Sequence, residues 1–176
     1  MAAPTMKTFG TGPTRAPAES ETLRVGIAKV HGCFELKQCL VGKLHDAGHR
    51  VIDFRDDQSQ PGNDYPDFVV PLARAVSSGD AAFSAAICGS SNGALIAANK
   101  VPGFRACLIH ETISAHQGVE DDNINNICLG GLLDAHANAW ELLHTFLAAR
   151  FGGAERHRRD LEKGAELDEI LLKEMP

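Results

Sequence analysis

The sequence predicts an α/β protein whose parallel sheet of five strands is covered by helices on both faces. From Leu23 onward, short apolar runs alternate with longer amphipathic ones, which is typical of βαβ units. The chain has 176 residues, of which 44% are hydrophobic and 23% charged, so one globular core is expected. No apolar run approaches the roughly 20 residues that cross a bilayer, so a membrane protein is not expected.

The apolar runs give the expected elements in order. Five runs predict strands over 24–28, 49–54, 83–88, 105–109 and 126–130. Apolar residues at helical spacing predict helices over 34–44, 68–76 and 137–151, and a last helix-like stretch near 167–171. Gly48 and the pair Gly152-Gly153 are natural helix ends.

Three regions follow from this pattern. Residues 1–22, rich in Pro, Thr, Gly and Ser, predict a flexible extension without the apolar core of a secretory signal. Residues 23–152 form the α/β domain, and residues 153–176 a helical tail. The odd number of cysteines, mostly within apolar stretches, favours reduced thiols and a cytoplasmic location.

Charge and spacing exclude several kinds of partner. The formal net charge of −6 gives no broad positive field, so neither nucleic acid nor an anionic membrane is an expected partner. The cysteines and histidines lack zinc-site spacing, so no metal is expected. An anion would have to be bound by local groups.

The segment from Cys88 to Lys100 is the strongest local signal, because it places a thiol at a predicted strand end, followed by small residues and a helix. Residues just beyond the carboxyl ends of parallel strands are where ligands bind. Two interpretations stay open from the segment alone: a tight turn with Cys88 buried as a small hydrophobe, or an active-site thiol facing an anion-binding loop.

The second interpretation has a definite chemistry. A thiol beside a helix start is favoured as thiolate, the form that can take a proton. Converting an aldose to a ketose needs one base that carries a proton between neighbouring carbons, and donors that hold the ene-diolate oxygens. Ser90, Ser91 and the N–H groups near Asn92 and Gly93 are candidate donors.

Motifs along the chain resemble the family of ribose-5-phosphate isomerase type B and galactose-6-phosphate isomerase, from about Leu23 to about Leu161. They are Gly-Cys-Phe-Glu-Leu-Lys at 32–37, Gly-His-x-Val-Ile-Asp-Phe at 48–54, Asp-Tyr-Pro-Asp-Phe at 64–68, Ile-Cys-Gly-Ser at 87–90, Ile-Ala-Ala-Asn-Lys-Val-Pro-Gly-Phe-Arg-Ala at 96–106, and Arg156-His157.

The resemblance implies a flavodoxin- or Rossmann-like three-layer sandwich, no cofactor, and a homodimer, with tetramers as a further option, whose sites straddle the interface. It implies Cys88 as the proton-moving base and Ser90 as a helper in ring opening. The tail would reach the partner's site or the dimer interface. Implied substrate contacts are Gly89, Ser91, Asn92 and Gly93 in the anion hole, Tyr65, Asn99 and Asn123 around the sugar, and His31, Arg156 and His157 at the phosphate end.

The chain departs from the family's pattern at several positions. Val30 stands where the family has an aspartate before His31, and Asp121 replaces a ring-opening histidine. A carboxylate can still accept a proton but cannot act as imidazolium near neutral pH. Leu132 and Asp160 replace two arginines that usually hold phosphate, which weakens the case for a phosphorylated substrate.

Three functional hypotheses follow. The first is an aldose–ketose isomerase of a small sugar or sugar phosphate, acting through a cis-ene-diol with Cys88 as base and with Ser90 and Asp121 assisting ring opening. The second keeps this chemistry but changes the substrate to an unphosphorylated or atypical sugar. The third is a non-catalytic sugar-binding homologue, motivated by Val30 and Asp121.

Overall fold

The structure, a computed structural model, describes residues 22–29, 33–54, 64–131 and 136–174, with side chains described as far as Asp168. Apart from Thr22, the predicted extension 1–22 lies outside the described residues. In chain order the elements are β1 (Arg24–Lys29), α1 (Phe34–Asp46), β2 (Arg50–Phe54), α2 (Tyr65–Ser77), β3 (Phe83–Cys88), α3 (Asn92–Ala98), β4 (Ala106–Leu108), α4 (Thr112–Asp122), β5 (Asn126–Gly130), α5 (His136–Ala148) and α6 (Glu155–Glu174).

The five strands form one parallel sheet in the order β2-β1-β3-β5-β4, and each lies within one residue of its predicted bounds. The predicted fold class, a three-layer α/β sandwich, is therefore confirmed. The order interchanges the last two strands of the flavodoxin arrangement. The burial of the strands agrees with this order, because every residue of β5 is buried, as an inner strand requires, whereas β4 is short and partly exposed.

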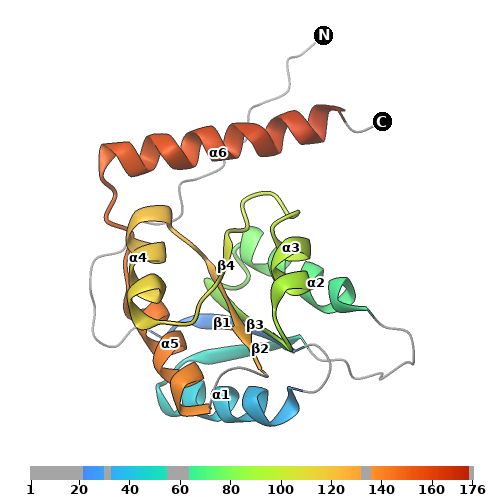
Figure 1. Cartoon of the computed structure of the whole chain (residues 1–176), viewed down its shortest axis with the longest axis vertical. Coiled ribbons are helices and arrows are strands. Elements are labelled where there is room, and N and C mark those ends of the chain that lie inside the picture. The colour runs from blue at the N-terminus through green and yellow to red at the C-terminus, as the bar shows by residue number, and fades with distance from the viewer. Residues whose placement is uncertain (1–21, 30–32, 55–63, 132–135, 175–176) are drawn as a thin grey trace.

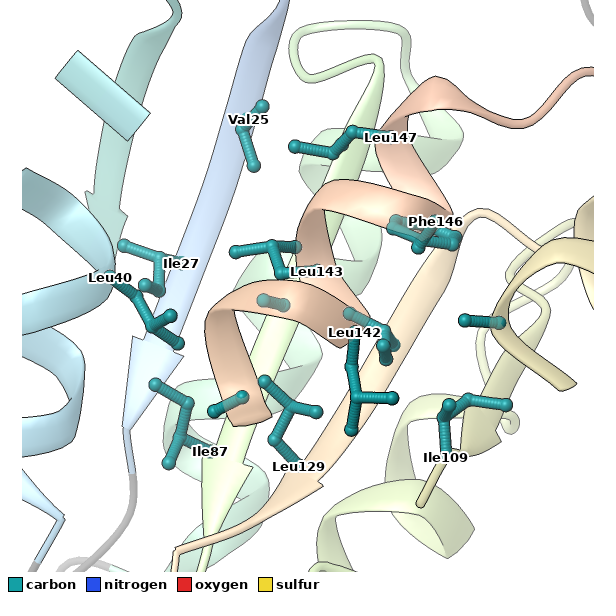
Figure 2. Close-up of a cluster of buried hydrophobic side chains, with 14 of the residues drawn as sticks. Val25, Ile27, Leu40, Ile87, Ile109, Leu129, Leu142, Leu143, Phe146 and Leu147 are labelled. Atoms are coloured by element: carbon teal, nitrogen blue, oxygen red, sulfur yellow. The ribbon is translucent and has the colours of Figure 1, made fainter. Parts of the chain in front are cut away.

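Two apolar clusters fill the spaces on either side of the sheet. One packs α1, α4 and α5 against the sheet and includes Leu40, Leu143 and Phe146, all fully buried (Figures 1 and 2). The other packs α2 and α3 against the opposite face and includes Leu72 and Cys128. In the described part of the chain, helices thus cover both faces of the sheet, which leaves the ends of the strands as places for a site.

The helix α5 ends at Ala148, so the predicted helix 137–151 is wrong in its last turn. The Arg150 guanidinium donates hydrogen bonds to the carbonyls of Leu147, at 2.8 Å, and Ala149, at 2.6 Å. These bonds satisfy carbonyls that a helix end leaves open, and Gly153 then turns the chain with φ at +65°. Within α5, Trp140 packs against the core beside the His144 ring, with ring centroids 5.6 Å apart.

The two ends of the sheet carry different elements. The carboxyl ends of the strands, near Ile87 and Leu129 in Figure 2, meet the starts of α1, α2, α3 and α4. The other end is crossed by α6, which contacts α4 and whose Asp168 carboxylate accepts a hydrogen bond from the Gly103 N–H at 3.1 Å (Figure 1). Among the described residues, no helix is both long and apolar enough to span a membrane.

Candidate active site

Cys88 is the last residue of β3 and is paired in register with Gly130 at the end of β5. Its other neighbour in the sheet, β1, ends at Lys29, so Cys88 lies where the chain connections leave the sheet in opposite directions. Ligands bind at such a switch point in open α/β sheets. The thiol is half-buried, against the cluster that includes α2 and α3.

The turn after Cys88 is held by the hydroxyl of Ser91. The hydroxyl donates to the carbonyl of Leu129 at 2.5 Å, its oxygen lies 3.3 Å from the Cys88 carbonyl oxygen, and the Cys88 N–H donates to it at 3.2 Å. Ser91 is fully buried and has φ at +60°, in the left-handed region. Its hydroxyl therefore fixes the turn, and the predicted substrate contact of Ser91 stays a prediction.

The rest of the predicted loop lies open beside the thiol. Ser90 and Asn92 are exposed, and Gly89 and Gly93 are partly exposed. A side chain at position 93 would lie 3.2 Å from two ring carbons of Tyr65, so this ring covers the Gly93 Cα closely. The starts of α2 and α3 thereby form one wall next to Cys88.

A second thiol and a cation lie close to Cys88. Burial raises the pKa of the Cys33 thiol, the neighbouring Cys88 raises it further, and Lys29 acts in the opposite direction. Gly131 lies in contact with both cysteines. Its N–H donates to the Cys88 carbonyl at 2.9 Å, and a Cβ added at this position would collide with Cys33 Sγ. The sequence did not assign a function to Cys33 or Lys29, although a lysine at the end of an apolar strand was a usable signal.

The buried Lys37 ammonium forms an ion pair with the Asp53 carboxylate, joining the first turns of α1 to the end of β2. Lys37 is 2% exposed. A buried lysine needs such a partner because desolvation of its charge is expensive. The pair therefore joins α1 to the edge strand β2 beside the candidate site. Both residues belong to the family-like motifs, but the sequence alone assigns a role to neither.

A separate group of predicted site residues gathers where α4 ends and α6 begins. The Asp121 carboxylate lies 3.5 Å from Nδ1 of His157, and the Arg156 Nε–H donates to His157 Nε2 at 2.7 Å. Asn123 is next in the chain after α4, in the left-handed region, and its carbonyl accepts from Arg105 Nε at 2.7 Å. The structure thus brings Asp121, Arg156 and His157 together, a contact that the sequence did not predict.

The two groups lie at opposite ends of the sheet within one chain. Helix α4 runs back from the carboxyl ends of the strands, so Asp121 precedes β5 whereas Cys88 is level with the last residue of β5. The five residues of β5 alone span roughly 13 Å at about 3.3 Å per residue. Cys88 and Asp121 of one chain therefore cannot act on the same small sugar.

Asn99 is placed away from the thiol, at the end of α3. Its side chain donates to the Ala106 carbonyl at 3.0 Å and accepts from the Ala106 N–H at 2.8 Å. These two bonds tie α3 to the first residue of β4, so the structure gives Asn99 a structural part. Of the remaining predicted positions, Val30, His31 and Leu132 lie outside the described residues.

Among the described residues, no cluster of three or more His, Cys, Asp or Glu side chains is arranged to hold a metal ion. All five cysteines are present as thiols. The expectation that the protein needs neither metal nor other cofactor stays a prediction.

Comparison with known proteins gives the family. A sequence profile of the Ribose/Galactose Isomerase family matches residues 25–163. The ribose-5-phosphate isomerase B of Mycolicibacterium paratuberculosis is 32% identical to the chain over 146 residues, which cover 83% of this chain and 92% of that protein.

Solved structures agree with the sequence comparison. Ribose-5-phosphate isomerase B of Clostridium thermocellum matches with a TM-score of 0.79 and 34% identity, covering 85% of this chain and 99% of that one. The enzyme of Mycoplasma genitalium with bound ribulose-5-phosphate matches with a TM-score of 0.77 and 29% identity, covering 83% and 96%. By sequence and fold, this chain belongs to the ribose/galactose isomerase family.

Proposed function

We propose that this chain is an aldose–ketose isomerase of the ribose-5-phosphate isomerase B type, with Cys88 as the base. The observation that carries the proposal is the place of Cys88, at the switch point of the sheet beside an open loop. Membership of the family, and the similar enzyme described with bound ribulose-5-phosphate, support a pentose phosphate as substrate.

The proposed reaction moves one proton between two carbons. The Cys88 thiolate takes the proton from C2 of the open-chain aldose, the C1=C2 bond forms, and O1 takes a proton from the Ser90 hydroxyl to give the ene-diol. The Ser90 oxygen takes the proton of O2 as the C2=O bond forms, and the Cys88 thiol returns its proton to C1. In this proposal the Ser90 hydroxyl, which is exposed, and the loop N–H groups from Gly89 to Gly93 hold the two oxygens.

The proposed active site is shared between two chains. Because Cys88 and Asp121 lie at opposite ends of one sheet, a site that uses both needs the α4–α6 end of a second copy. A homodimer with two-fold symmetry would form two such sites, each with the tail 153–176 of the partner. Pairing of dimers into tetramers and a cytoplasmic location stay predictions from the sequence.

Replacement of Cys88 tests the proposal. We expect Cys88→Ala to lower kcat for ribose 5-phosphate by about a thousandfold or more, because the proposed reaction then lacks its base. Cys39→Ala is the matched control, since Cys39 lies on α1 and is also partly buried. Thermal unfolding should show both variants folded. A Cys88→Ala enzyme that keeps more than a few per cent of the rate would refute the role of the thiol.

One observation favours a different substrate. Asp160 is exposed on α6 one turn after Arg156, so a carboxylate lies on the same helix face as a proposed phosphate-binding guanidinium. This favours a sugar with less negative charge than a phosphate ester. Rates on ribose 5-phosphate, six-carbon sugar phosphates and free tetroses to hexoses decide between the candidates, and a clear preference for ribose 5-phosphate excludes the second.

A further inference from the structure

The Asp121 carboxylate lies at ion-pair distance, 3.5 Å, from Nδ1 of the His157 imidazole. The His157 side chain is 12% exposed, and Asp121 is 41% exposed. Nδ1 of His157 is buried and has no hydrogen-bond partner within ordinary distance among the described residues, the Asp121 oxygen at 3.5 Å being its ionic neighbour. Such contacts are often long in enzymes without substrate and shorten when the site is filled.

The opposite side of the ring fixes its tautomer. The Arg156 Nε–H donates to His157 Nε2 at 2.7 Å, so this nitrogen carries a lone pair and the ring proton belongs on Nδ1, facing Asp121. Arg156 is exposed and is held there by no other described contact of its guanidinium, so a ligand can displace it. The ring is then a neutral base with a carboxylate behind it and an accessible Nε2.

We propose that His157, oriented by Asp121, is the group that opens the sugar ring. This inference rests on the proposed isomerase function, because only a cyclic substrate needs opening before Cys88 can act. Asp121 is then a positioning residue, and the imidazole of His157 supplies the acid–base chemistry that a carboxylate at position 121 cannot supply near neutral pH. The pair would act in the site that contains the partner's Cys88.

The step balances without another reactant. Nε2 of His157 takes the proton from the O1 hydroxyl of the furanose, the C1–O4 bond breaks, and the C1=O1 bond forms. The electron pair of the broken bond stays on O4, which takes the proton back from the imidazolium. The Asp121 carboxylate stabilises the imidazolium while it exists, as a hydrogen-bonded carboxylate does in other acid–base pairs.

A second histidine–carboxylate pair provides a matched control. His116 Nδ1 lies 3.3 Å from the Glu120 carboxylate, on α4 close to Asp121, but the two side chains are 54% and 49% exposed. This pair is held by adjacent helical turns and is screened by solvent. Loss of an exposed pair on the same helix should therefore leave turnover unchanged.

Two substrates separate ring opening from proton transfer. Ribose 5-phosphate is mostly a furanose, whereas erythrose 4-phosphate cannot close such a ring because its O4 carries the phosphate. We expect His157→Ala to lower kcat/KM for ribose 5-phosphate by about a hundredfold or more, and for erythrose 4-phosphate by less than about threefold. His116→Ala should change neither value.

The kinetics of the variant provide a readout that a structural defect would not change. With His157→Ala, ribose 5-phosphate should react at a rate limited by spontaneous ring opening, so the rate becomes independent of enzyme concentration once the enzyme is in excess. Asp121→Asn should lower kcat for ribose 5-phosphate by about tenfold with KM little changed. In the double variant carrying His157→Ala and D121H, part of the lost rate should return.

The outcomes distinguish the two proposals. If the wild-type enzyme converts neither sugar phosphate, the proposed function fails. If the wild type converts both and His157→Ala loses both equally, or loses neither, the ring-opening role is overturned while the isomerase function stands. Thermal unfolding of His157→Ala should match that of His116→Ala, which excludes a general loss of folding.

Discussion

At the scale of single residues, Gly131 is the position where packing and the candidate site are most tightly joined. An added Cβ would collide with Cys33 Sγ and lie 3.4 Å from Ile87 Cγ2. We expect Gly131→Ala to lower the free energy of unfolding by about 1–3 kcal/mol, because a well-packed interior resists added volume. Urea denaturation measures this cost.

Gly42→Ala is the control for that substitution. Gly42 lies inside α1, and a Cβ there would meet nothing within 4 Å, so alanine should leave stability unchanged or raise it by up to about 1 kcal/mol. Combining Gly131→Ala with Cys33→Ala removes the sulfur that causes the collision and should recover part of the loss. Equal stability of Gly131→Ala and wild type would contradict this description of the packing.

Cys128 makes stability depend on alkaline pH. Burial raises the pKa of its thiol to about 12, from 9.0 for a free thiol, while the Asn126 side chain at 3.3 Å from Sγ opposes the shift. A raised pKa means that the folded state is favoured below pH 9 and that this contribution is lost as the pH rises from 9 towards 12.

Urea denaturation at pH 8 and pH 10.5 tests this dependence. The free energy of unfolding should fall more between the two pH values for the wild type than for Cys128→Ala, which lacks the thiol whose pKa folding raises. Other titrating groups contribute equally to both proteins. Parallel losses in the two proteins would show that Cys128 does not contribute.

At the level of secondary-structure elements, the Asn99 side chain links α3 to β4 by two hydrogen bonds. Replacing it with alanine removes both bonds to Ala106 and leaves backbone groups of a short edge strand without these partners, which should cost about 1–3 kcal/mol. KM for ribose 5-phosphate should stay within about twofold of wild type. A large rise in KM with unchanged thermal stability would instead show that Asn99 contacts the sugar.

The strands could be predicted from the sequence because each is a short apolar run between polar segments. Helix α4 is less visible, since only Ala115 and Val119 of its residues are buried and the apolar pattern is therefore weak. The exchange of β4 and β5 in the sheet could not be predicted from the sequence either, because strand order depends on packing between distant segments. The predicted helix end at residue 151 is too late, because the Arg150 side chain donates to the carbonyls of Leu147 and Ala149 and the helix ends at Ala148.

The same contrast applies to the candidate site. Cys88 could be found from sequence because it ends an apolar strand, and ligands bind at such ends. The structural part of Ser91 and the contact of Asp121 with His157 depend on bonds made after folding. From the sequence alone Asp121 is a poor substitute for histidine, whereas our proposal uses its contact with His157 and makes it a positioning residue.

At the scale of the whole molecule, the separation of the two residue groups predicts complementation between subunits. Cys88→Ala and His157→Ala chains, carrying different tags, would be co-expressed and the mixed dimers purified. Each mixed dimer has one site with both groups intact and one with neither, so about half of the wild-type activity on ribose 5-phosphate is expected.

Dimers that carry both tags but only Cys88→Ala chains provide the control, and should stay inactive. If the site were completed within one chain, the mixed dimers would show no more activity than the separate variants. That outcome would contradict the shared site without affecting the role of Cys88.

Trp140 is a fluorescent probe of one layer of the molecule. It is the only tryptophan in the chain, and it reports on the helical layer containing α1 and α5, whereas Cys88 packs on the other face of the sheet. Its fluorescence therefore records the detachment of one layer, while circular dichroism records every helix. Coincident transitions in the two signals would mean that both layers leave the sheet together, as a single cooperative unit.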